Sequence, residues 1–117
     1  MYLKNNSTGK TIIEKVRFAN GFFSNMKGLM FESEKNFDYA LIFPLPYESR
    51  IGASVHMMFV FFPIDIIFLD SKKHVVDKAT LVPWMLNYTP KKPAKYFIEM
   101  QAGKASMAKI GDMIGWS

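Results

Sequence analysis

The sequence of 117 residues contains no cysteine. This absence excludes disulfide bonds, thiolate metal ligands and cysteine nucleophiles. The first ten residues, "MYLKNNSTGK", contain no apolar core of the kind that an export signal needs. Because many small secreted domains depend on disulfides, the two features together predict a cytoplasmic protein.

Arginine is also scarce, since Arg17 and Arg50 are the only two. The net charge of +5 comes from residues 71–117, which contain eight lysines and three acidic side chains. A one-sided basic field can attract nucleic acid, acidic proteins or lipid head groups. Arginine, however, is the usual reader of bases and phosphates, and none lies in that part of the chain. We therefore expect a solubilising lysine surface rather than a nucleic-acid interface.

Familiar catalytic and ligand motifs are missing as well. The chain has no GxSxG nucleophile elbow, no glycine-rich phosphate loop and no HxxxH or HxH pair. With two histidines and no cysteine, a metal site would have to be assembled entirely by tertiary structure. We expect neither a metal nor a cofactor.

What the sequence does contain is a long apolar run, "VHMMFVFFPIDIIFL", from Val55 to Leu69. Its fifteen residues fall short of the roughly 20 that cross a bilayer, and they include Pro63 and Asp65. The run is therefore expected to form the buried core of a protein that does not span a membrane.

Pro63 divides this run into two predicted strands, at 55–61 and 64–69. Proline breaks a helix, and the residues around it are mostly aromatic or β-branched, which favours strands. The second strand is apolar on both faces, as in a strand covered from both sides. One face carries Ile64, Ile66 and Phe68, and the other carries Ile67 and Leu69 together with Asp65.

Shorter patterns predict the remaining elements. Alternation and residue type predict strands at 11–18, 39–43, 74–81 and 96–101, with a last edge strand at 113–114. Helical spacing predicts a short helix capped by Asn20 and a helical turn at 104–109. Residues 44–54 and 82–93 are expected to be irregular.

These elements predict one mainly β domain over residues 1–117. No strand alternates with a long helix, so an antiparallel β-sandwich or a partly closed, jelly-roll-like barrel with one or two short helices is the expected fold. The 11 phenylalanines and 9 methionines are expected chiefly to fill its core. An apolar surface that faces a protein partner or a second copy of the chain, as in a homo-oligomer, is the alternative.

The order of several motifs resembles the domain of unknown function number 192 family. These motifs are "GLM" at Gly28–Met30, "HMMFVFFPIDIIFLD" at His56–Asp70, "YFIEMQAG" at Tyr96–Gly103 and "IGDMI" at Ile110–Ile114. Bacterial members usually carry Trp-Met-Lys-Asn and Ile-Pro-Leu-Asp where this chain has His56–Met57 and Pro63–Ile64–Asp65, so it is more similar to archaeal members. The resemblance implies a jelly-roll-type sandwich and no particular activity.

Three polar side chains are candidates for a ligand site: His56, Asp65 and Glu99. Asp65 lies in the most apolar part of the chain, where an unpaired carboxylate would cost several kcal/mol, so it needs partners. A structural role that caps the strand start is the favoured interpretation, and a pocket carboxylate is the alternative. His56 begins the same apolar run, and Glu99 lies within a predicted strand.

The favoured hypothesis is a β-module that binds a small molecule or a peptide in a cleft near His56 and Asp65. An enzyme that uses the Asp65 carboxylate is a second hypothesis. A third is an accessory domain that binds an acidic partner or nucleic acid through the C-terminal lysines. The residues alone leave all three open.

Overall fold

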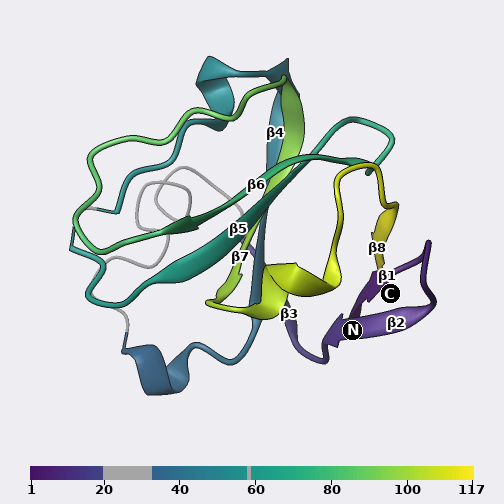
Figure 1. Cartoon of the computed structure of the whole chain (residues 1–117), viewed down its shortest axis with the longest axis horizontal. Coiled ribbons are helices and arrows are strands. Elements are labelled where there is room, and N and C mark those ends of the chain that lie inside the picture. The colour runs from purple at the N-terminus through teal and green to yellow at the C-terminus, as the bar shows by residue number, and fades with distance from the viewer. Residues whose placement is uncertain (20–32, 58) are drawn as a thin grey trace.

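The computed structural model describes residues 1–19, 33–57 and 59–117. The described chain is mainly β, as expected, and its strands form two sheets that do not close into a barrel (Figure 1). The strands are β1 (Leu3–Asn5), β2 (Lys10–Ile13), β3 (Val16–Phe18), β4 (Ala40–Ser49), β5 (Ile64–Leu69), β6 (Val75–Leu81), β7 (Ala94–Gln101) and β8 (Ile114–Trp116).

The larger sheet has the strand order β3-β4-β7-β5-β6, so β7 is its central strand. Its strands pair antiparallel except for the parallel pair β3–β4. The smaller sheet has the order β2-β1-β8 and brings the two ends of the chain together, with Tyr2 N–H donating to the Ser117 carbonyl over 2.7 Å. Figure 1 shows this small sheet at one end of the large one.

Strand β5 forms where the second half of the apolar run predicts it, at Ile64–Leu69. All six of its residues are buried, and it pairs with β6 on one side and β7 on the other. Its two apolar faces enter two different cores, which confirms the predicted division between Ile64, Ile66 and Phe68 on one side and Ile67 and Leu69 on the other.

The two cores differ in what covers the sheet. The small sheet packs against the face that carries Ile67 and Ile98, and it contributes Leu3 and Ile12 to that core. The opposite face carries Phe68 and is covered by irregular segments, including residues 53–57 and 59–62. We call this second side of the large sheet the loop-covered face.

The single strand predicted at 11–18 is wrong. The chain leaves the small sheet after β2 and enters the large sheet at β3, and the two residues between them, Glu14 and Lys15, are exposed. This crossing between sheets explains why Glu14 interrupts an otherwise apolar face.

The loop predicted at 44–54 is also wrong in its first half, because β4 continues to Ser49. The strand carries Pro44, which pairs with Tyr96 of β7, and its register with β7 shifts between Pro44 and Ser49. Among the described residues, β3 pairs with β4 only as far as Ile42, so Pro44 lies beyond this pairing. Proline is tolerated there because it has no N–H to donate.

The strand predicted at 55–61 does not form. Val55 makes one isolated bridge with Tyr88, and the Met57 N–H donates to the Met85 carbonyl, after which the chain turns. Phe59 has φ of 60°, a left-handed conformation that ends strand pairing. The first half of the apolar run is therefore a covering loop, with Val55 and Met57 buried and Phe61 exposed.

Helical structure in the described residues consists of three short 3-10 helices: η1 (Glu34–Asn36), η2 (Ile51–Ala53) and η3 (Lys104–Met107). The last confirms the helical turn predicted at 104–109, and β8 confirms a final edge strand. The helix predicted to start at Asn20 lies outside the described residues. Across the described part of the chain, no helix is long and apolar enough to cross a membrane.

Candidate ligand-binding face

Asp65 is buried and fully engaged by its own chain. Its Oδ1 accepts a hydrogen bond from the Thr80 hydroxyl at 2.6 Å, and its Oδ2 accepts from the N–H groups of Gly103 and Ala105 at 2.8 and 2.9 Å. The carboxylate therefore caps the first turn of η3, rather than the start of its own strand. Both carboxylate oxygens of Asp65 are therefore engaged in hydrogen bonds within the fold.

Glu99 lies on the opposite side of the sheet from Asp65. Glu99 pairs directly with Ile66 of β5, and neighbouring residues of a strand point to opposite faces, so Asp65 and Glu99 cannot reach one pocket. Glu99 belongs to the loop-covered face and lies on the central strand β7, two residues before the strand ends. The structure thus separates two of the three candidate residues.

The environment of Glu99 is apolar and enclosed. Its strand neighbours on the same face are Leu41 of β4 and Ile66 of β5. The side chain is 5% exposed, and its Oε1 has no hydrogen-bond partner in the described part of the chain. Burial without a partner raises the pKa of Glu99 from 4.5 to about 8, so the carboxyl is mostly neutral at pH 7.

When the strand pairing is followed from Glu99 through β4 to β3, the cation reached on this face is Arg17. It pairs with Leu41, which places it two strands away from Glu99, about 10 Å between Cα atoms. The guanidinium lies over the ring of Tyr39, 4.2 Å from its centroid, in a cation–π contact. Arg17 is therefore held beside Glu99's neighbour without forming an ion pair with Glu99.

The loop that contains His56 is fastened to residues 82–88 by backbone hydrogen bonds. Val55 and Tyr88 exchange two of them, at 2.9 and 2.7 Å, and the Trp84 N–H donates to the Met57 carbonyl at 2.9 Å. His56 itself is exposed on this cover, between two buried neighbours. His56 thus lies on an exposed position of a loop, and not on the strand predicted at 55–61.

Two aromatic residues, one in the loop that contains His56 and one in the segment 82–88 bonded to it, adopt an uncommon backbone conformation. Phe59 and Trp84 have φ of 60° and 66°, and their rings touch edge to face with centroids 4.9 Å apart. A bulky side chain at positive φ is strained, and such strain clusters at binding sites. The cover is thus a specific, costly arrangement rather than a loose connection.

Asp77 is a second carboxylate on the loop-covered face, and unlike Glu99 it is satisfied. It accepts hydrogen bonds from the Tyr88 hydroxyl at 2.7 Å and from the Lys91 N–H at 3.0 Å. Burial and the neighbouring carboxylate together raise the pKa of Tyr88 to about 12. Asp77 therefore anchors the cover to β6. Asp77 is not among the candidates predicted from the sequence, although an aspartate directly after the apolar pair Val75–Val76 is a signal for a buried carboxylate.

A hollow of about 220 Å³ opens at one end of the loop-covered face. Its apolar walls include Phe37 and Phe62, which also belong to the core of that face, and Gln101 and Glu34 supply polar groups. Gln101 follows Glu99 by two residues on β7, about 7 Å along the strand and on the same face. Glu99 does not line the hollow; it lies on the same face, two residues before the lining residue Gln101 on β7.

These features define a class of protein: a small β protein with two sheets, in which fastened loops cover one face of the larger sheet and enclose an unpaired carboxyl. The chain belongs to the DUF192 family, described as "Uncharacterized ACR", whose model matches residues 2–116. The resemblance drawn from the sequence motifs is thereby confirmed.

Archaeal relatives resemble the chain over almost its whole length. A UPF0127 protein of Pyrococcus furiosus is 46% identical over 115 residues, which cover 97% of this chain and 96% of that protein. A UPF0127 protein of Thermococcus sibiricus is 45% identical over 116 residues, which cover 97% of this chain and 73% of that protein. Their names assign no activity.

Two crystal structures share the fold. A protein of unknown function from Novosphingobium aromaticivorans is 27% identical, with a TM-score of 0.74 over 86% of this chain and 74% of that one. A protein from Sinorhizobium meliloti, provisionally described as a transcription regulator, has a TM-score of 0.81 over 97% of this chain and 89% of its own. Its identity is 21%, so the likeness concerns the fold alone. Function must therefore be argued from the site.

Proposed function

We propose that the protein is a small-molecule-binding β-module whose ligand lies against the loop-covered face, with Glu99 as its polar anchor. The observation that carries this proposal is the buried Oε1 of Glu99, on the central strand of that face, which has no hydrogen-bond partner among the described residues. More than nine in ten buried polar groups in native proteins have a partner, so an exception calls for an explanation. A ligand that brings the missing partner supplies one.

The state of Glu99 indicates which ligand group would suit it. A neutral carboxyl offers one O–H donor and retains acceptor capacity. An amide or hydroxyl group on the ligand would complement both in one contact. The rest of the face is apolar, with Leu41 and Ile66 beside the anchor, so the body of the ligand should be apolar too.

The hollow between Phe37 and Phe62 supports a route to this anchor. It is lined by two aromatic side chains and by Gln101, and Gln101 lies two residues beyond Glu99 on the same face of β7. Its volume of about 220 Å³ is smaller than the usual 300–1,000 Å³ of a drug-sized site, which favours a small ligand over a peptide.

General acid–base catalysis by Glu99 is a second candidate function. A carboxyl whose pKa lies near 8 is suited to proton transfer at neutral pH. Catalysis also needs a second polar group in reach of the same substrate atom, whereas the strand neighbours of Glu99 are apolar. Binding therefore remains our preferred function.

The C-terminal lysines offer less support for a macromolecular partner. The Lys78 ammonium donates to the carbonyls of Ala105 and Ala108, and the Lys95 ammonium donates to the Leu45 carbonyl. These two lysines stabilise their own fold.

We further propose a cytoplasmic location, which the complete absence of cysteine supports.

Thermal unfolding with a panel of small probes tests the proposed function. The panel contains short-chain and one-ring amides, alcohols and amines, and it is applied to the wild type, Glu99→Leu and Glu99→Gln. A true ligand at a hundredfold excess over its Kd stabilises the fold by about 2.7 kcal/mol. We expect stabilisation of the wild type that is lost in Glu99→Leu and reduced in Glu99→Gln.

Glu14→Gln is the matched control, because Glu14 is exposed and lies between β2 and β3, so it removes a carboxyl without touching the face. It should respond to the probes as the wild type does. Equal stabilisation of Glu99→Leu and the wild type by every active probe would contradict the proposal, and so would a panel with no active probe.

A further inference from the structure

We propose a second site, for a phosphate-type oxyanion, in the hollow between β1, β8 and the turn that joins β5 to β6. The hollow has a volume of about 250 Å³. Three lysines from two separate parts of the chain line it: Lys4 from β1, and Lys72 and Lys73 from the turn. It belongs to the side of the molecule that carries the small sheet, and it is independent of the loop-covered face.

None of these three lysines forms an ion pair within the described residues. The ion pairs there join Lys15 to Asp38 and His74 to Asp70. Among the side chains that line the hollow there is no carboxylate; the polar ones besides the lysines are Asn6 and Ser117. Three lysines that line one concave surface without an acidic side chain create a positive field there, which a bound oxyanion would balance.

Aromatic rings hold two of the ammonium groups in place instead. The Lys73 ammonium lies 4.2 Å from the ring centroid of Trp116, and the Lys4 ammonium lies 5.7 Å from that of Tyr2. A cation–π contact orients a lysine without neutralising its charge. Lys73 is thus positioned and still available to an anion.

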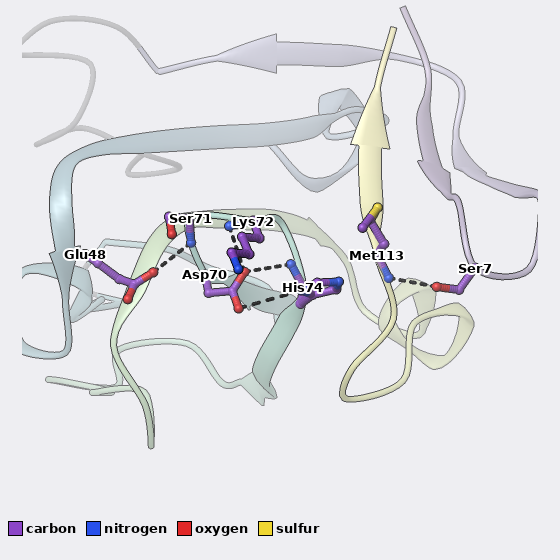
Figure 2. Close-up of polar contacts among 7 residues, drawn as sticks. All are labelled: Ser7, Glu48, Asp70, Ser71, Lys72, His74 and Met113. Carbon is purple, nitrogen blue, oxygen red and sulfur yellow. Dashed lines mark hydrogen bonds and ion pairs between the residues drawn. The ribbon is translucent and has the colours of Figure 1, made fainter.

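The turn that presents Lys72 and Lys73 is rigidly built, as Figure 2 shows. The Asp70 carboxylate accepts hydrogen bonds from the N–H groups of Lys72 and His74, at 3.0 and 2.9 Å. On its outer side the turn is held by Glu48, which accepts from the Ser71 N–H at 2.7 Å. Asp70 and Glu48 are therefore used in holding the turn, and neither lines the hollow.

Lys73 adopts a conformation that lysine normally avoids. Its φ is 67°, in the left-handed region that favours glycine or asparagine. The Lys73 N–H donates to the Asp70 carbonyl, and the Lys73 carbonyl accepts from Ile114, both at 2.9 Å. Lysine at this position strains the backbone, and such strain is typical of residues whose side chains have a functional role.

Gly115 of β8 forms part of the opposite wall of the hollow, and the Asn6 amide packs closely against it. A Cβ atom added to Gly115 would lie 2.6 Å from the Asn6 Nδ2, so a larger residue there would displace the Asn6 amide. Asn6 then contributes a polar side chain to the same hollow as the three lysines. The volume corresponds to about eight water molecules, enough for a diphosphate or a small phosphate ester.

Titration with sodium pyrophosphate, followed by backbone amide NMR shifts at constant ionic strength, tests this site. We expect saturable shifts at Lys4, Lys73 and Gly115. Lys73→Asn removes the charge while keeping a residue that tolerates positive φ, and it should weaken binding about tenfold or more, the loss expected for one charge-assisted hydrogen bond. Lys72→Gln, on an exposed side chain, provides a second variant if Lys73→Asn does not fold.

Lys91→Gln and Lys92→Gln are matched controls, because both lysines are exposed and neither lines the hollow. They remove the same charge and should leave the affinity for pyrophosphate within about twofold, since exposed charges are largely screened. Parallel titrations with inorganic phosphate and glycerol phosphate separate a free-phosphate ligand from an ester, and saturation by either supports the site. Equal weakening by the controls, or equal shifts with chloride, would overturn the proposal.

Discussion

Asp65 and Glu99 lie on adjacent, paired strands and face opposite sides of the same sheet. The register that sets Glu99 against Ile66 determines this, since Ile66 follows Asp65 directly. Asp65 enters a network in which both of its oxygens are used, whereas Glu99 enters an apolar interior where its Oε1 is left without a partner. One buried carboxylate secures the fold, and the other carries the proposed function.

The pH dependence of stability should reveal Glu99. Its pKa is about 8 in the folded state against 4.5 as the ordinary value, so the folded protein holds a proton that the unfolded chain releases between those pH values. The contribution of the protonated Glu99 carboxyl to the free energy of unfolding is therefore complete below pH 4.5, and it is lost as the pH rises toward 8. We expect urea unfolding to show stability falling by a few kcal/mol across this window.

Glu99→Gln should remove that slope, because glutamine does not titrate. Glu14→Gln, which changes an exposed carboxyl, should keep it. If the wild type and Glu99→Gln depend on pH in the same way from 4.5 to 8, Glu99 does not hold its proton in the folded protein.

Replacing Glu99 by leucine should stabilise the protein while abolishing ligand binding. An apolar side chain of similar size in place of an unsatisfied buried carboxyl removes a desolvation cost, with a gain of about 1–3 kcal/mol. Chemical denaturation at pH 7 measures this gain. Destabilisation by Glu99→Leu, with the fold intact, would mean that the carboxyl already has a partner in the unliganded protein.

Asp65→Ala should be among the more damaging single substitutions. It leaves the Thr80 hydroxyl and two backbone N–H groups, at Gly103 and Ala105, without their acceptor. We expect a loss of about 3 kcal/mol in the free energy of unfolding. The matched control is Asp38→Ala, because Asp38 is half exposed and its partner Lys15 is exposed too, so it should lower the free energy of unfolding far less than Asp65→Ala does.

Asn5 should link the two ends of the chain. It is fully buried, and its Nδ2 donates to the Met107 carbonyl at 2.9 Å and to the Asp112 carboxylate at 2.8 Å. Asn5→Ala should therefore speed amide hydrogen exchange in residues 107–112 and lower stability by about 2 kcal/mol. Asn87→Ala, on an exposed residue, should change neither. Unaltered exchange at 107–112 would show that this link is not needed.

Much of the fold could be predicted because local patterns carry it. The run Ile64–Leu69 is apolar on both faces, so its burial from both sides and the division of its side chains follow from alternation alone. The first half of the same run has an equally β-like composition, yet its hydrogen bonds go to residues 82–88, far along the chain. No local pattern specifies such a pairing.

The candidate site was harder to predict for the same reason. The sequence indicates that Asp65 needs partners, but the N–H groups that satisfy it come from residues 103 and 105. Glu99 was a candidate only as one polar residue in a strand. Its importance comes from the register with β5 and from its place on the central strand, and both are tertiary properties.

The proposed function rests on the state of one carboxyl, so a direct titration of Glu99 tests it best. The side-chain carboxyl carbon of Glu99 is followed by ¹³C NMR from pH 3 to 10, with the Glu99→Gln spectrum to assign its resonance. A midpoint near 8, well separated from those of the exposed glutamates, is the result we expect. A midpoint near 4.5 would show that Glu99 is solvated or already paired. That result would contradict the proposal that the unpaired Glu99 carboxyl binds the ligand.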